Sequence, residues 1–159
     1  MSAADDTHPA FGDLLRVHTS VIDGIVVLSV AGELDVSTAP KLDRAITRCI
    51  TGPLAGLIVD LANVNFMASA GISVLLEGDS TARTVSKWFG VVANSRVTQR
   101  PMELLGLNQI MNIYSTLDAA RSDVATWTRP LPMQHVFNAG YFISQSDAAA
   151  SSSDLKVVV

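Results

Sequence analysis

The stretch LIVDLANVNFMASAGISVLL, residues 57 to 76, carries a strand, a short connection and the start of a helix. Residues 57–61 form a short apolar run, which is typical of a strand buried on both faces in the middle of a sheet. A loop is expected next. From Gly71 to about Lys87 apolar residues recur at helical spacing, which predicts an amphipathic helix.

The residues before this stretch predict a hairpin and a first helix. Residues 14–32 read as two strands around Asp23-Gly24, a dipeptide that readily adopts a tight hairpin turn. In the first strand, one face is expected to point to the core; it carries Leu15, Val17, Thr19 and Val21. A helix follows, capped by Ser37 or Thr38 and ending near Gly52.

The residues after it continue the alternation of strands and helices. The expected elements are a strand over 88–94, a helix over 96–107, a strand over 109–114 and a closing helix over 115–127. Strands interleaved with helices predict an α/β fold whose mixed sheet is mainly parallel and has one antiparallel edge hairpin.

Composition bounds the class of protein. The chain has 159 residues, 48% of them hydrophobic, and a mean hydropathy of +0.34, which fits a globular domain with tails. No apolar run reaches the roughly 18 to 20 residues of a membrane span, so no membrane association is expected. The acidic N-terminus is unlike a signal peptide, and a cytoplasmic location is therefore predicted.

The net charge and the cysteine content argue against a nucleic-acid-binding protein and against a fold held by disulfides or by a cysteine-rich zinc site. A net charge of −4 argues against a nucleic-acid partner, and Arg96 and Arg100 predict a solvated helix end rather than a phosphate-binding track. Cys49 is the single cysteine, which excludes an internal disulfide and a cysteine-rich zinc site.

No catalytic constellation is found in the sequence. There is no glycine-rich phosphate loop after a strand, and the three histidines, His8, His18 and His135, lie far apart. We therefore expect no catalytic residue, no cofactor and no metal site.

Changes in composition divide the chain into three parts. We expect an N-terminal tail over residues 1–11, one domain over 12–127 and a C-terminal extension over 128–159. The extension contains an apolar patch at 136–143, which suits docking to a partner or to a second copy of the chain. A homodimer is therefore one of the assemblies that the sequence allows.

Three motifs, in order, resemble the anti-sigma factor antagonist family, also called STAS domains. They are GELD at 32–35, VDLANVNFMASAGISVLL at 59–76 and MELLGLNQIMNIYSTLDAA at 102–120. The resemblance implies an αβ sandwich with helices mainly on one face of a mixed sheet.

The resemblance also implies a switch protein rather than an enzyme. In the phosphorylatable branch, the dephosphorylated antagonist binds an anti-sigma factor of the serine-kinase type and thereby frees a sigma factor. The kinase phosphorylates one serine, the complex dissociates, and a serine phosphatase resets the antagonist. The partners implied are therefore an anti-sigma factor kinase and a serine phosphatase.

The counterpart of the family's phosphorylated serine is Ser69. The family pattern reads Asp-Ser, then Ser or Thr, then Gly, whereas here Ala68 and Ala70 flank Ser69 and Gly71 is retained. Ser69 can cap the following helix or accept a phosphate, because a helix N-terminus suits both a hydroxyl oxygen and an anion. Because Ala68 stands where the family pattern has an aspartate, binding of the partner without phosphorylation of Ser69 is the alternative.

The resemblance places a partner-binding surface on three segments. Its residues are Asp35, Val36, Ser37, Ala68, Ser69, Ala70, Ser73 and Glu77. Asp35 and Ser37 also suit helix capping, and Glu77 suits a solvated helix face. The alternatives in function are a scaffold or accessory subunit of a signalling or transport complex, and a small-molecule sensor.

Overall fold

The structure, a computed structural model, describes residues 14–127. The expected N-terminal tail at 1–11, the extension at 128–159 and its apolar patch at 136–143 lie outside the described residues. The division of the chain into these three parts therefore stays a prediction.

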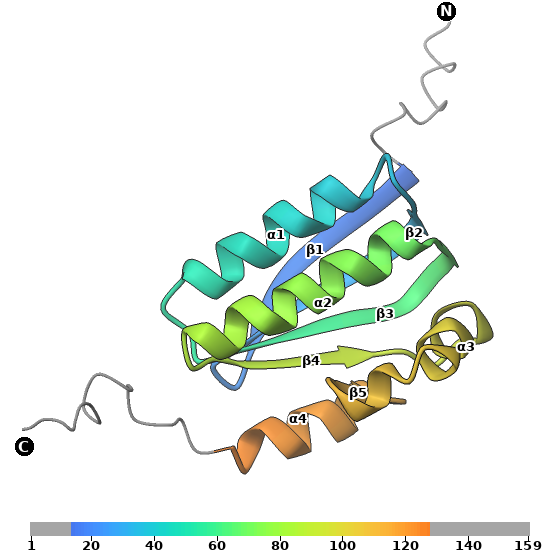
Figure 1. The fold of residues 1–159 in the computed structure, drawn as a ribbon. Helices are drawn as coiled ribbons and strands as arrows, with labels where there is room; N and C mark the ends of the chain where they lie inside the picture. Colours follow the sequence, from blue (N-terminus) through green and yellow to red (C-terminus); the bar gives the residue numbers. More distant parts are fainter. Residues whose placement is uncertain (1–13, 128–159) are drawn as a thin grey trace, which may run out of the picture. The chain divides into compact units, whose positions relative to one another are not determined.

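A five-stranded mixed sheet forms the centre of the domain, with its strands side by side in chain order (Figure 1). The strands are β1 (Leu15–Ile22), β2 (Ile25–Leu34), β3 (Gly56–Met67), β4 (Trp88–Val92) and β5 (Asn112–Tyr114). β1 runs antiparallel to β2, and every other neighbouring pair is parallel. The predicted mainly parallel sheet with one edge hairpin is confirmed.

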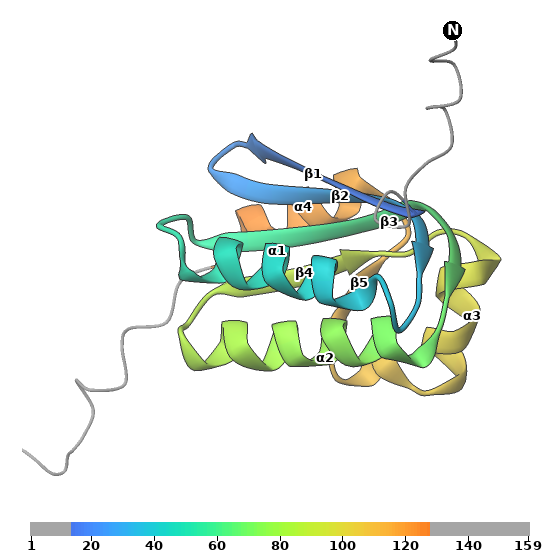
Figure 2. The same ribbon diagram turned by 90° about the horizontal axis from the view of Figure 1, so that it is seen from above.

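Helices cover both faces of this sheet (Figures 1 and 2). They are α1 (Ala39–Thr51), α2 (Ser69–Thr84), α3 (Arg96–Leu104), the short 3-10 helix η3 (Leu107–Gln109) and α4 (Leu117–Ala125). The two longest, α1 and α2, lie side by side on one face, as the expectation of helices mainly on one face requires. α4 lies on the opposite face, and α3 packs against β3.

Two apolar cores follow from this arrangement. The larger lies between the sheet and the helices α1 and α2, and includes Leu28, Leu42, Val59, Leu75 and Phe89. The smaller lies under α4, and includes Val27, Ile58, Trp88, Ala120 and Val124. Because β4 and the first half of β3 are covered on both faces, they read as nearly continuous apolar runs.

The hairpin between β1 and β2 turns as predicted. Asp23 and Gly24 both have positive φ, 54° and 80°, which is the conformation of a type I′ turn. The expectation of a continuous core face on β1 is wrong for its second half, where Thr19 and Val21 are exposed. α1 packs near the start of β1, where the Lys41 Nζ donates to the Leu15 carbonyl at 2.7 Å.

β3 is much longer than the strand expected at 57–61. It continues to Met67 through residues that were expected to form a loop, and α2 begins at Ser69 rather than Gly71. Pairing with β4 stops at Asp60, but the end of β3 stays paired with β2 through Glu33–Phe66 and Leu34–Met67. This ladder satisfies the backbone of a polar segment whose side-chain pattern alone does not indicate a strand.

Candidate functional site

Asp35 organises the turn that leads into α1. Its Oδ1 accepts hydrogen bonds from the Ser37 amide at 2.9 Å, the Ser37 hydroxyl at 2.7 Å and the Thr38 amide at 3.1 Å. In return the Thr38 Oγ1 accepts from the Asp35 amide at 2.9 Å, which makes a reciprocal capping box. Asp35 therefore caps the turn before α1, and the Ser37 hydroxyl donates to Asp35. Thr38 occupies the N-cap of α1 without a side-chain hydrogen bond to the helix, so the prediction that Asp35 or Ser37 caps the helix itself is wrong.

The same hydrogen bonds set the charge state of the turn. The Ser37 hydroxyl, followed by the Thr38 amide, holds the pKa of Asp35 below its ordinary value. Asp35 is therefore ionised at neutral pH. Between Asp35 and Ser37, the side chain of Val36 is 79% exposed, so this ordered turn presents an apolar side chain to solvent.

Ala68, and not Ser69, occupies the N-cap of α2. Its backbone is extended, with φ −97° and ψ 172°, and no side chain caps this end of the helix. Ser69 is the first helical residue and is exposed. The interpretation of Ser69 as a helix cap is therefore wrong. Within residues 14–127, the amides of Ser69 and Ala70 have no hydrogen-bond partner.

The start of α2 is fixed directly beside the Asp35 turn. The Ala68 amide donates to the Leu34 carbonyl at 2.9 Å. Gly71 packs so closely on Leu34 that a Cβ atom at this position would lie 2.5 Å from the Leu34 Cγ. Figure 2 shows the ends of β2 and β3 and the starts of α1 and α2 at one edge of the domain. We call this the docking edge.

The predicted surface residues differ in their accessibility. Five are exposed, namely Val36, Ser37, Ser69, Ser73 and Glu77, and three are half-buried, namely Asp35, Ala68 and Ala70. Ser73 and Glu77 follow Ser69 at intervals of four residues, so they extend the exposed stripe about 12 Å along α2. Ala70 instead packs against the larger core.

Phe66 also lies at the docking edge, although the sequence pattern assigned it no role. It pairs with Glu33 near the end of β3, and half of its side chain is exposed. The sequence signal that could have identified Phe66 is an aromatic residue in a polar stretch just before the helix that carries Ser69. It was missed because this stretch was expected to be a loop.

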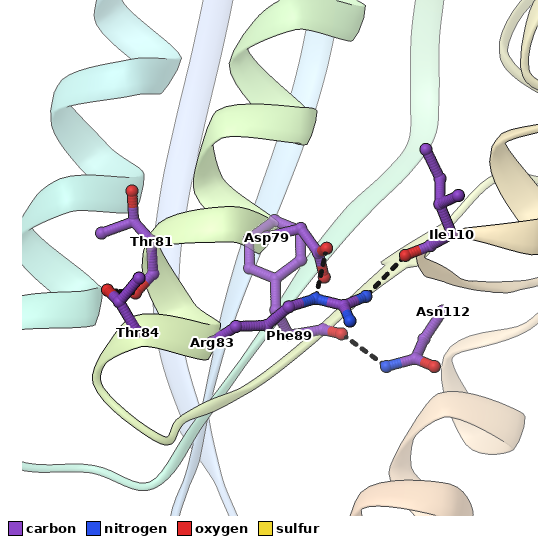
Figure 3. Close-up of polar contacts among 7 residues, drawn as sticks. All are labelled: Asp79, Thr81, Arg83, Thr84, Phe89, Ile110 and Asn112. Atoms are coloured by element: carbon purple, nitrogen blue, oxygen red, sulfur yellow. Dashed lines mark hydrogen bonds and ion pairs between the residues drawn. The ribbon is translucent and has the colours of Figure 1, made fainter. Parts of the chain in front are cut away.

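A polar cluster fixes the other end of α2 (Figure 3). Asp79 is only 7% exposed, and its carboxylate accepts from the Arg83 Nε at 2.8 Å. The Arg83 guanidinium also donates to the Ile110 carbonyl at 2.5 Å. Arg83 thus joins α2 to the segment between η3 and β5, and the helix that carries Ser69 is held at both ends.

We also searched the described residues for metal-binding groups, reactive side chains and membrane-spanning helices. Within residues 14–127, no three His, Cys, Asp or Glu side chains are grouped to hold a metal ion. His18 is exposed on β1, and His8 and His135 lie outside the described residues. Burial raises the pKa of the Cys49 thiol. In the same range, no helix has the length and apolarity needed to cross a membrane.

Comparison with known proteins shows the family. Residues 16–120 match the STAS domain family, and the chain belongs to it. The anti-sigma-F factor antagonist RsfB of Mycobacterium tuberculosis is 36% identical over 112 residues, which cover 70% of this chain and 91% of RsfB.

Solved structures share the fold. A crystal structure of an anti-sigma factor antagonist from Mycobacterium paratuberculosis matches with a TM-score of 0.65 and 36% identity, covering 71% of this chain and 96% of that one. The phosphorylated form of the Bacillus cell fate determinant SpoIIAA matches with a TM-score of 0.55 and 22% identity, covering 69% and 99%. At that identity the SpoIIAA match supports the fold alone.

Proposed function

We propose that this chain is an anti-sigma factor antagonist that acts by binding rather than by catalysis. It binds an anti-sigma factor of the serine-kinase type through the docking edge and so releases a sigma factor. The observation that carries the proposal is the placement of exposed Ser69 beside the Asp35 turn, in a chain 36% identical to RsfB. A cytoplasmic location belongs to this proposal.

The exposed apolar side chains of the docking edge support a binding function. Val36 and Phe66 project from backbone that is held by the Asp35 capping box and by the ladder between β2 and β3. Apolar side chains on ordered backbone lose little conformational entropy when a partner covers them. Ser73 and Glu77 supply polar contacts at the rim of such an interface.

We further propose that phosphorylation of Ser69 releases the partner. The Ser69 hydroxyl is exposed, and it lies at a helix start whose first two amides have no partner within the described residues. A phosphate carries about 1.5 to 2 negative charges, and the amides and dipole of a helix start favour an anion. The fold therefore accommodates the phosphate, whereas a partner lying on Val36 and Phe66 meets a large hydrated charge. A serine phosphatase then restores the binding form.

Binding does not depend on this modification. Ala68 lacks the carboxylate of the family pattern, but it leaves the Asp35 turn and the exposed stripe of α2 in place. The relatives described above are anti-sigma factor antagonists, so they do not favour a scaffold or transport role.

The experiment combines size exclusion with intact-mass analysis. The chain is mixed with purified serine-kinase-type anti-sigma factors from the same genome, first without ATP and then with it. Co-elution before ATP, and a gain of one phosphate that releases the complex, are expected. Ser69→Ala should bind but gain no phosphate, and Ser73→Ala, the matched exposed serine one turn along, should gain it normally. Absence of any complex refutes the binding proposal, and equal phosphate gain in Ser69→Ala refutes the site.

A further inference from the structure

α3 exposes an apolar row that the domain itself does not use. Thr98 and Met102 point into the domain and are fully buried, so the opposite side of the helix faces solvent. Val97 and Leu104, seven residues apart, share that side, and Leu104 is 72% exposed. The row continues past the helix end in Leu105, which is 60% exposed. We call these three side chains the α3 ridge.

Two arginines run beside the α3 ridge. Arg96 and Arg100 lie four residues apart on α3, so their side chains stack along the helix next to Val97 and Leu104. Both are exposed, and neither forms an ion pair within residues 14–127. On a chain with a net charge of −4, α3 thus carries two positive charges and one negative charge, that of Glu103, beside the apolar row.

The α3 ridge adjoins the docking edge. α3 packs against β3, and Figure 1 places it by the end of that strand, beyond the point where pairing with β4 stops. That end of β3 carries Phe66 and runs directly into Ala68 and Ser69. A partner that covers the docking edge can therefore extend onto α3 without crossing the domain.

We propose that the α3 ridge is a second contact site for the anti-sigma factor and receives an apolar segment of that partner flanked by carboxylates. This inference rests on the proposed function. Charge selects the occupant, since Arg96 and Arg100 have no acidic partner within the described residues and each would gain one in the complex.

The size of the ridge also points to a shared interface. A stable protein interface buries about 800 Å² on each partner, which is more than three partly exposed side chains supply. The ridge alone is therefore too small to hold a second copy of the chain. It instead adds apolar area to a larger surface shared with the docking edge and with the exposed stripe of α2. Ser69 is not part of the α3 ridge, so contacts at the ridge strengthen binding whether or not Ser69 is phosphorylated.

The test uses paired charge and apolar variants of the full chain, with affinity for the anti-sigma factor measured by calorimetry. Arg96→Glu with Arg100→Glu should weaken binding about tenfold or more, and Leu104→Ser should weaken it by a similar factor. The matched controls are Arg44→Glu with Arg48→Glu, also exposed and four residues apart but on α1, and Val21→Ser at the hairpin. They should change affinity less than about threefold. Circular dichroism melting confirms that each variant is folded.

The outcomes separate this inference from the proposed function. If the wild-type chain binds and the α3 variants bind equally well, the inference is wrong while the function stands. If the wild-type chain binds no anti-sigma factor, the function fails and the inference with it. Two further results overturn the inference, namely an α3-dependent dimer in sedimentation and α3-dependent binding to vesicles of anionic phospholipid.

Discussion

Replacing Ala68 with aspartate should stabilise the domain, although it introduces a charge at a half-buried position. Ala68 has the extended backbone of an N-cap, but its methyl group accepts no hydrogen bond. The Ala70 amide has no partner within the described residues and lies at the second helical position, where a cap oxygen can accept from it. The perturbation thus adds a single missing interaction to an otherwise ordered helix start.

The expected gain follows from two terms. An aspartate in place of alanine at an N-cap contributes about 1 kcal/mol through its hydrogen bond. Its charge beside the positive end of the helix dipole adds roughly 0.3 to 1 kcal/mol. Partial burial of position 68 removes part of this sum, which leaves about 1 kcal/mol. For a domain of this size, that corresponds to a rise in Tm of roughly 4 °C.

Urea and thermal unfolding at neutral pH measure this gain, and two variants separate its causes. Ala68→Asn keeps the accepting oxygen without the charge and should retain most of the gain. Ser69→Asp places a charge in the first turn without the cap geometry and should gain only the smaller dipole term. A cap lowers the pKa of the new aspartate, so its contribution is present above about pH 4 and is lost as pH falls through the lowered pKa.

A single result refutes the reasoning. If Ala68→Asp is no more stable than Ser69→Asp at neutral pH, the side chain at position 68 does not reach the free amides. The free amides at the start of α2 then gain nothing from a hydrogen-bond acceptor placed at position 68. A phosphate on Ser69 is then not expected to bind those amides either.

Three further changes test the supports of the site. Asp35→Asn should lower the free energy of unfolding at neutral pH; because the pKa of Asp35 is held below its ordinary 3.8, the deficit in the urea midpoint should shrink as pH falls through that lowered pKa. Gly71→Ala should cost about 1 to 3 kcal/mol in urea unfolding, since its Cβ would lie 2.5 Å from the Leu34 Cγ, and should weaken partner binding. Arg83→Leu should cost about 1 to 3 kcal/mol by leaving a buried carboxylate unpaired, and adding Asp79→Asn should recover part of that loss in the same assay.

The fold was largely predictable because its elements carry strong periodic signals. The Asp23-Gly24 turn, the buried run at 57–61 and the amphipathic helices all obey local rules, and the structure confirms them. Several strand ends were wrong: β2 continues to Leu34, β4 ends at Val92, and the largest differences are at β3 and β5. β3 gains six residues beyond 61 from pairing with β2, and β5 is reduced to Asn112–Tyr114, with Gln109 in η3 and a turn at Ile110. The extension of β3 arises from tertiary pairing, which side-chain pattern does not encode.

The site was less predictable than the fold. Asp35 accepts the hydrogen bonds of a local turn, which its own sequence favours, but that turn lies one step before the helix it was expected to cap. The cap at Ser69 failed by one residue, because the position of a helix boundary depends on how β3 ends beside Leu34. Arg96 and Arg100 were interpreted as a solvated helix end. Both are exposed, and the packing of α3 against β3 places their helix beside the strand that leads to Ser69.

The way α2 is held decides how a phosphate on Ser69 would act. The start of the helix is fixed by the bond from Ala68 to Leu34 and by the close packing of Gly71, and its last turns are fixed by Arg83 through Asp79 and Ile110. A helix anchored at both ends cannot shift without breaking these contacts, so a phosphate changes the charge and bulk of the docking edge while the helix stays in place. The switch is then local. The strength of the switch is the difference between the partner's affinity for the form with a Ser69 hydroxyl and its affinity for the form with a phosphate at that position. Contacts farther along α2 or on α3 raise both affinities equally, so they do not change that difference.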